Sequence, residues 1–422
     1  MNNERIGLFK KIGLLLSAVG PGIFLIGYNI GTGSITTMAS AGSRYGMTLF
    51  WALFLSCVFT FVMMVAYGRY TAVTGETAMN AYKKHLPWGK ALALYSIIGL
   101  AIGELSALVG IMAIITDLIS EWTRIVFGQA VNKIVIAAII IIGSYILLWD
   151  GKYSRFEKFL LILVIIMGAS FLGSMVMVIP KPMDVIVGLV PGIPNEPTAF
   201  LIVAGMAGTT CSAMVFIMRS IVVAEKGWTV KDIKKESVDA LFSSFMMLLL
   251  SAAVMACAAG TLYQIGKPVE QAIDMVKTLE PLAGRFAIAI FILGVIGAGV
   301  STLFPIILVA PWLICDYTGR ERNIRSPLFR ILGAAGLLLG LIVPIFGGKP
   351  VWVMIGSQAL QATLLPVITV PIMILLNRKD LMGEHKAPLW LNLSLWATLI
   401  YAFVTTYAAI VGLPDTLKDL FS

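Results

Sequence analysis

Charged residues and histidines are scarce in this sequence. Of its 422 residues, 13% are charged and 59% are hydrophobic, whereas about 25% of an ordinary soluble domain is charged. The only histidines are His85 and His385, and the HExxH, GxSxG and phosphate-loop motifs are absent. The composition therefore excludes a soluble globular fold, argues against an enzyme and gives no reason to expect a cofactor.

Cysteine is also rare. The four cysteines stand singly in apolar segments and form no CxxC pair: Cys57, Cys211, Cys257 and Cys315. Isolated cysteines in such surroundings behave as small hydrophobic residues. Neither a disulfide framework nor a thiolate metal site is expected.

Long apolar stretches are abundant, and each can cross about 30 Å of hydrocarbon. The sequence predicts an all-α integral membrane protein with about eleven transmembrane spans. Their expected ranges are 13–42, 48–72, 91–116, 131–149, 157–179, 198–224, 238–263, 284–315, 328–347, 350–376 and 388–412. Residues 1–12 then form a cytoplasmic segment, residues 13–412 a single transmembrane domain and residues 413–422 an extracytoplasmic tail. The first span is expected to be retained rather than cleaved as a signal peptide.

The net charge of +9 could suggest a nucleic-acid partner, but the positions of the basic residues explain it differently. Of the 31 Lys and Arg, 21 fall in segments that would share one side of the membrane, and nine fall on the other side. By the positive-inside rule, the richer side is cytoplasmic. The sequence thus predicts a cytoplasmic N-terminus, an extracytoplasmic C-terminus and a lipid environment, with no nucleic-acid partner.

Residues 225–236 (EKGWTVKDIKKE) form the longest charged run. Such a run could bind a partner protein, but a solvated loop on the cytoplasmic side explains it more simply. We expect a solvated loop and assign it no chemistry.

Two of the predicted spans contain too many glycines and prolines for uninterrupted helices. The first contains Gly20, Pro21 and Gly22 and then residues 27–34 (GYNIGTGS), and the sixth contains residues 205–212 (GMAGTTCS). Close packing of small residues could account for such clusters. However, hydroxyl side chains gather at both clusters, as expected where freed backbone groups line a cavity. We therefore predict that spans one and six are discontinuous.

The two interrupted spans lie five spans apart, which is the arrangement of a five-plus-five repeat. The first repeat would cover about residues 13–179 and the second about 198–376, followed by an extra helix at about 388–412. In transporters with inverted repeats, paired discontinuous helices form the substrate site near the middle of the membrane. The pattern predicts a carrier of a small solute. A non-transporting receptor or structural membrane protein is the alternative, and the paired interruptions argue against it.

Five stretches carry a family resemblance. They are Gly20 and Pro21 followed by the interruption, residues 41–46 (AGSRYG), residues 154–157 (SRFE), residues 297–302 (GAGVST), and residues 357–383 from SQ through LP to NRKDLMG. Together they resemble the Nramp family of proton-coupled divalent metal transporters over about residues 15–385. The resemblance implies a LeuT-type inverted-repeat fold with eleven helices.

The sequence departs from this family at the metal site. The family's Asp-Pro-Gly-Asn motif corresponds to residues 31–34 (GTGS), so Gly31 stands where the ligating carboxylate would be. The Met-Pro-His motif corresponds to residues 212–214 (SAM), so Ser212 replaces the thioether and Met214 the histidine. The chain therefore resembles a divergent, magnesium-transporter-like branch, in which Ser34, Ser212 and Gln358 are at most neutral oxygen ligands of a metal.

Span three of the family carries an acidic pair that moves protons, and this chain keeps only Glu104, in residues 103–107 (GELSA). Ionisable residues inside membrane spans are usually functional. Glu104 is therefore predicted to relay protons or charge. The alternative is a structural partner to an arginine or a hydroxyl.

The predicted substrate-binding residues are Asn29, Gly31, Thr32, Ser34, Gly208, Thr209, Ser212 and Gln358. Their oxygens form a hard ligand set without a soft ligand, which favours magnesium over manganese or iron, because magnesium keeps several waters. The positive N-terminal ends of half-helices beginning near Gly33 and Ala213 would instead suit an anion. We expect transport of a divalent cation, magnesium first, with protons as a candidate coupling ion. The alternative is a small anion or neutral solute such as bicarbonate or an amino acid.

Overall fold

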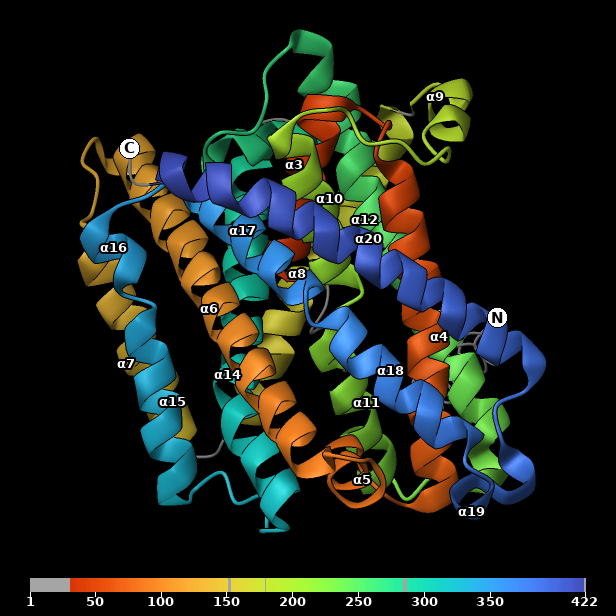
Figure 1. The fold of residues 1–422 in the computed structure, drawn as a ribbon. Helices are drawn as coiled ribbons and strands as arrows, with labels where there is room; N and C mark the ends of the chain where they lie inside the picture. The colour runs from red at the N-terminus through yellow and green to blue at the C-terminus, as the bar shows by residue number, and fades with distance from the viewer. Residues whose placement is uncertain (1–30, 151–152, 179, 284–286, 421–422) are drawn as a thin grey trace, which may run out of the picture.

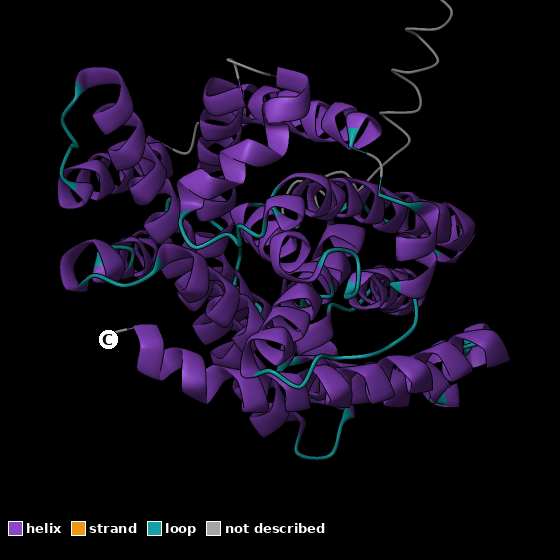
Figure 2. Ribbon diagram, turned by 90° about the horizontal axis from the view of Figure 1, so that it is seen from above, coloured by secondary structure: helices purple, strands orange, loops and turns teal. Residues whose placement is uncertain are grey.

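The computed structural model describes residues 31–150, 153–178, 180–283 and 287–420. Within these ranges every regular element is a helix and none is a strand, as Figure 2 shows. Eight helical segments are long and apolar enough to cross a bilayer, and two shorter apolar helices cover Lys133–Trp149 and Ile165–Met177. The all-α membrane fold predicted from the sequence is confirmed.

Each of the eleven predicted spans has a helical counterpart, with α3 as the described part of the first span. In chain order they are α3 (Thr32–Tyr45), α4 (Phe50–Thr74), α6 (Gly89–Phe127), α7 (Lys133–Asp150), α8 (Tyr153–Met177), α10 (Pro197–Thr210) with α11 (Ala213–Glu225), α12 (Ile233–Thr261), α14 (Ala287–Thr318), α15 (Pro327–Leu339) with α16 (Ile342–Phe346), α17 (Pro350–Ala362) with α18 (Leu365–Asn377), and α20 (Leu389–Leu420).

Short helices lie in the connections between the spans. They are α5 (Ala78–His85), α9 (Pro182–Val187), η1 (Val230–Asp232), η2 (Tyr263–Ile265), η3 (Ala272–Leu279), α13 (Glu280–Ala283), α19 (Lys379–Met382) and η5 (Gly383–His385). Figure 1 places α5 and α19 at one end of the helix bundle and α9 at the opposite end. This separation matches the predicted order of crossings, and the assignment of the α5 end to the cytoplasm stays a prediction.

The sixth span is interrupted where the sequence predicts. Helix α10 ends at Thr210, Ser212 adopts an extended conformation (φ −69°, ψ 129°), and α11 begins at Ala213. In the first span, Gly31 is extended (φ −97°, ψ −170°) and α3 begins directly after it. Gly20, Pro21 and Asn29 lie outside the described residues.

The tenth span is also interrupted, although its apolar sequence predicts one continuous helix. Helix α17 ends at Ala362 and α18 begins at Leu365. Proline has no backbone N–H, so Pro366 cannot donate the helical hydrogen bond to the carbonyl four residues earlier, which is that of Ala362. The interruption is therefore explained by Pro366. The apolar composition of the span gives no sign of it.

Glycines allow the helices around the interruptions to pack backbone against backbone. A Cβ atom on Gly208 of α10 would lie 1.8 Å from the carbonyl oxygen of Gln358 in α17, and one on Gly42 of α3 would lie 2.3 Å from the carbonyl oxygen of Met255 in α12. Small residues serve the same purpose in other membrane helix pairs. Helix α20 runs obliquely across the outside of this assembly (Figure 1) and packs on α10 and α17.

The charged run at residues 225–236 is only partly a solvated loop. Lys226 and Lys231 are exposed, but Glu236 is fully buried and pairs with Arg219 of α11 at 2.9 Å. Arg219 also pairs with Asp239. The expectation of a wholly solvated segment is therefore wrong at its C-terminal end, because a buried arginine in the preceding helix requires carboxylate partners.

Candidate functional site

A buried cavity of about 30 Å³ lies where the interrupted spans meet. In the described part of the chain, five helical spans contribute to its wall. The lining residues are Gly31, Gly33 and Ser34 at the start of α3, Glu104, Ala107 and Ile111 of α6, Gly208, Thr209 and Ser212 at the interruption between α10 and α11, Thr302 and Ile306 of α14, and Met354, Gln358 and Gln361 of α17.

The structure brings most of the predicted site residues together at this cavity. Seven of the nine line it: Gly31, Ser34, Glu104, Gly208, Thr209, Ser212 and Gln358. Thr32 is fully buried but is not part of the lining, and its Oγ1 lies 2.9 Å from where a Cβ atom of Gly299 would be. Asn29 lies outside the described residues. The binding roles themselves stay predictions.

Gln361 joins two sides of the cavity. Its Oε1 accepts a hydrogen bond of 3.0 Å from the Ser212 hydroxyl, and its Nε2 donates one of 3.4 Å to the carbonyl oxygen of Gly103. Gly103 directly precedes Glu104 in α6. The Gln361 amide therefore connects the interruption of the sixth span to the turn of α6 that carries the carboxylate.

The serine at the start of α3 is held by a neighbouring helix. Ser34 Oγ lies 3.1 Å from Ser251 Oγ of α12, and both residues are buried. This hydrogen bond adds to the close contact between α3 and α12 at Gly42. The second half of the first span is thus fixed against α12 while its first turn faces the cavity.

Seven lining residues are absent from the predicted set, and two of them, Met354 and Gln361, carry a signal in the sequence. Met354, Gln358 and Gln361 follow the spacing i, i+4, i+7, which places them on one face of α17. Of these three residues only Gln358 was predicted, although Met354 and Gln361 lie on the same face of the helix. Met354 is a methionine in the cavity wall, and the predicted ligand set of oxygens did not include it. Thr302 lies in the GAGVST stretch that supported the family resemblance.

Glycines keep the cavity open on the side of α3. A Cβ atom on Gly31 would lie 2.8 Å from Thr302 Oγ1, and one on Gly33 would lie 2.7 Å from Gln358 Nε2. Any larger side chain at either position must displace a polar group of the opposite wall. Gly31 and Gly33 therefore determine how closely α14 and α17 approach the start of α3.

The charge of the cavity wall comes from one residue. Glu104 is 3% exposed and, within the described ranges, is the only acidic or basic side chain among the lining residues. The other polar side chains are hydroxyls and amides, which are neutral. The first turns of α3 and α11 add the partial positive charge of helix N-termini.

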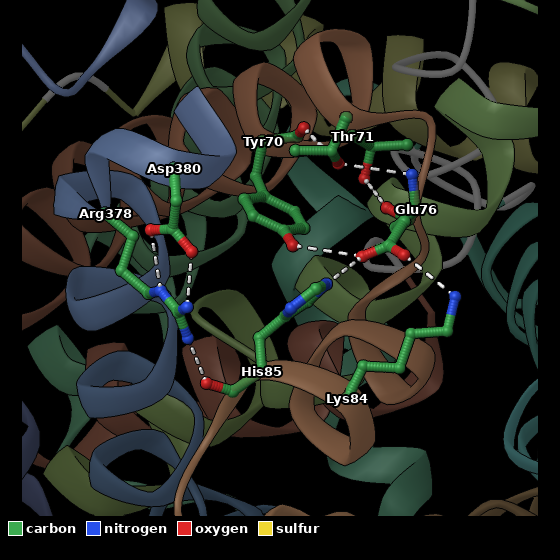
Figure 3. A network of polar contacts seen from close by, with 8 residues as sticks. Tyr70, Thr71, Glu76, Lys84, His85, Arg378 and Asp380 are labelled. Atoms are coloured by element: carbon green, nitrogen blue, oxygen red, sulfur yellow. Dashed lines mark hydrogen bonds and ion pairs between the residues drawn. The ribbon is translucent and has the colours of Figure 1, made fainter. Parts of the chain in front are cut away.

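A second polar network holds the α5 end of the bundle together (Figure 3). The Glu76 carboxylate accepts hydrogen bonds from Lys84 at 2.9 Å and Tyr70 at 3.4 Å, and its Oε2 lies 2.7 Å from His85 Nε2. The backbone carbonyl of His85 accepts from Arg378, which also pairs with Asp380 of α19. Partial burial raises the pKa of Glu76, but the hydrogen bonds and positive charges of Lys84 and His85 outweigh that effect and hold its pKa below the ordinary value.

Solved structures with the same arrangement of helices are membrane transporters. The Eremococcus coleocola manganese transporter, solved in complex with an aromatic bis-isothiourea compound, superposes with a TM-score of 0.72 at 15% identity over 96% of this chain and 87% of that one. Mhp1, a nucleobase-cation-symport-1 family transporter, gives 0.60 at 13% identity over 95% and 92%. The fold is therefore the LeuT-type transporter fold, as predicted.

Sequence comparison identifies the branch of this fold. The Nramp family, described as natural resistance-associated macrophage protein-like, matches residues 22–412. The divalent metal cation transporter MntH of Listeria welshimeri is 23% identical over 412 residues, covering 93% of this chain and 88% of that protein. The MntH of a Nostoc species is 24% identical over 403 residues, covering 92% and 88%. The chain belongs to the Nramp family of integral membrane proteins, and these relatives are transporters rather than enzymes.

Proposed function

We propose that this protein transports a divalent metal cation across the membrane through the cavity between its interrupted spans. The proposal is supported by the family, by the relatives named divalent metal cation transporters, and by the position of the cavity at two helix interruptions. Transporters of this architecture bind their substrates at such interruptions. The observation that carries the proposal is that seven predicted site residues, one of them a carboxylate, line a single cavity of ionic size.

The size of the cavity favours an ion over an organic solute. A buried site needs at least about 10–15 Å³ to hold one water molecule, so about 30 Å³ accommodates roughly two waters, or one ion with a water. An amino acid is several times larger. Bicarbonate is smaller but would carry its negative charge toward Glu104, which disfavours it at this site.

Magnesium is the first candidate for the cargo. The lining is rich in hydroxyl and amide oxygens, and no cluster of three or more His, Cys, Asp or Glu side chains that could hold a metal exists in the described part of the chain. Magnesium is bound in proteins through few direct ligands and keeps several of its waters. A wall of neutral oxygens with one carboxylate suits this mode of binding.

Manganese is the second candidate, and one residue favours it. Met354 of α17 is a lining residue of the cavity, although the sequence lacks the methionine of the family's sixth-span motif. Thioether ligands favour softer transition metals over magnesium. If Met354 contacts the transported ion, the tenth span provides the thioether ligand that the sixth span lacks.

Protons are the proposed coupling ion, and the cytoplasm is proposed to lie at the α5 end. The first proposal rests on the single carboxylate in the cavity, since intramembrane acidic residues commonly carry protons in transporters. The second rests on the excess of Lys and Arg in the connections at that end.

Ion uptake into proteoliposomes tests the proposed function. We expect saturable uptake of magnesium that manganese inhibits, and no uptake of bicarbonate or amino acids. Met354→Leu, which keeps the apolar volume and removes the sulfur, should weaken inhibition by manganese more than it weakens magnesium uptake. The absence of flux for every divalent cation in the panel, or a clear flux of bicarbonate or an amino acid, would overturn the proposal.

A further inference from the structure

Glu104 faces a site from which the expected carboxylate is missing. The family's first-span motif has an aspartate at the position of Gly31, and the part of the chain that the structure describes has no acidic residue other than Glu104 among the cavity-lining side chains. Glu104 is supplied instead by α6, the third span, and is 97% buried. The carboxylate in the described part of the cavity wall therefore comes from the third span and not from the first.

A dication at this cavity requires that charge. Removing a divalent cation from water into a buried site is unfavourable unless anionic oxygens or retained waters compensate for its lost hydration. The serine and threonine hydroxyls and the two glutamine amides are neutral, and the N-termini of α3 and α11 contribute partial positive charge. Among the lining side chains that the structure describes, Glu104 is therefore the one able to balance the charge of the cargo.

The two glutamines of α17 have different tasks. Gln361 uses Oε1 to accept from Ser212 and Nε2 to donate to Gly103, so both ends of its amide are occupied by protein groups. Gln358 lies one turn earlier on the same face of α17, with its Nε2 close to Gly33 at the start of α3. Gln358 is placed to contact an ion, whereas Gln361 is placed to hold the Glu104 turn of α6 against the sixth-span interruption.

We propose that Glu104 is the anionic ligand of the transported cation, in place of the absent first-span carboxylate, and that Gln361 is a positioning residue for it. This inference rests on the proposed function, because it names the charged ligand of the same site. It differs from a pure proton relay, since a ligand contributes to cation affinity even when no proton gradient is present.

Equilibrium binding to the purified full-length protein separates these roles. Isothermal titration with magnesium and with manganese, without a membrane gradient, should show affinity at least about 100-fold weaker for Glu104→Gln than for the wild type. The matched control is Asp117→Asn on the same helix. Asp117 is buried and pairs with Lys133 at 2.6 Å, but it is not part of the cavity wall, so its loss should leave the affinity unchanged.

A relocated carboxylate tests whether charge is what Glu104 supplies. A Cβ atom at position 31 would lie 2.8 Å from Thr302 Oγ1, so Gly31→Asp is combined with Thr302→Ala to make room. In the Glu104→Gln background this pair should restore binding to within about tenfold of the wild type, whereas Thr302→Ala alone should not. A folded, monodisperse triple variant that binds no better than Glu104→Gln would contradict the proposal.

Transport kinetics test the positioning role of Gln361. Gln361→Leu removes both hydrogen bonds at similar volume, and loss of a residue that orients a ligand typically weakens metal affinity by about 10–100-fold. We expect KM for the cation to rise while the maximal rate per folded molecule changes much less. A fall in the maximal rate or in thermal stability with an unchanged KM would mean that Gln361 is only a structural residue.

The outcomes also separate this inference from the proposed function. If the wild type neither binds nor transports any divalent cation, the proposed function fails and the inference fails with it. If the wild type binds a divalent cation and Glu104→Gln binds it equally well, the transport function stands, and the assignment of Glu104 as the ligand is overturned.

Discussion

Arg219 Nη2 donates to Glu236 Oε1 over 2.9 Å, and neither side chain is exposed to solvent. The same guanidinium pairs with Asp239, and the indole ring of Trp228 lies 5.8 Å from its centre. The network ties α11, the second half of the interrupted sixth span, to the start of α12. One buried positive charge therefore fixes the element that continues from the candidate site toward the α5 end.

Removing this charge should destabilise the protein strongly. Arg219→Gln leaves two buried carboxylates without their counter-charge, and breaking a buried ion pair in this way costs about 3–5 kcal/mol. Thermal unfolding in detergent should show a large drop in melting temperature. The control is Arg124→Gln, because Arg124 is 62% exposed and its pair with Glu121 should contribute at most about 1 kcal/mol. Equally small falls in melting temperature for both variants would contradict this prediction.

The contact of α10 with α17 predicts a sharp difference between two glycine substitutions. In Gly208→Ala the new methyl group would meet the Gln358 carbonyl oxygen at 1.8 Å, so the two helices must separate beside the cavity. In Gly143→Ala of α7 the new methyl group would have no neighbouring atom within 4 Å. We expect Gly208→Ala to abolish uptake and reduce the yield of monodisperse protein, while Gly143→Ala behaves as wild type. Normal uptake by Gly208→Ala would show that this close contact is not needed.

The helical spans were predictable because lipid offers no hydrogen-bond partners, and a single long apolar segment can pair its own backbone groups only as a helix. Long apolar stretches therefore predict helices directly. The interruption between Thr210 and Ala213 was also predictable, since glycines and hydroxyls cluster there. The interruption before Pro366 has no such cluster, and a proline within a membrane span is often accommodated without a break.

The parts of the candidate site that stand out in the local sequence could be predicted. Ser34 and Ser212 lie at the interruptions themselves, and Glu104 is conspicuous as an acidic residue in an apolar span. The pairing of Gln361 with Ser212 and Gly103 joins residues 149 and 258 positions apart, and no local pattern encodes it. Glu236 was expected in a solvated loop for the same reason: the local sequence does not show that it pairs with Arg219 of another helix.

The Glu76 network predicts a dependence of stability on pH. A glutamate whose pKa is lower in the folded protein stabilises the fold above its unfolded pKa, and that contribution is lost as the pH falls through the folded pKa. Wild type should therefore melt at a higher temperature than Glu76→Gln at neutral pH, and the difference should shrink below about pH 4. Melting curves between about pH 3 and pH 7 measure this. A difference that is absent at neutral pH, or unchanged at the acid end, would contradict it.

The predicted orientation can be tested with single introduced cysteines. The four native cysteines are all buried, so background labelling should be low. Lys181, just before α9, and Lys231, in η1, are both exposed and lie in connections predicted to face opposite sides of the membrane. In intact cells a membrane-impermeant maleimide should label Lys181→Cys, and it should label Lys231→Cys only after the membrane is permeabilised. The reverse pattern would place the basic connections outside the cell, and the positive-inside assignment of this chain would then be wrong.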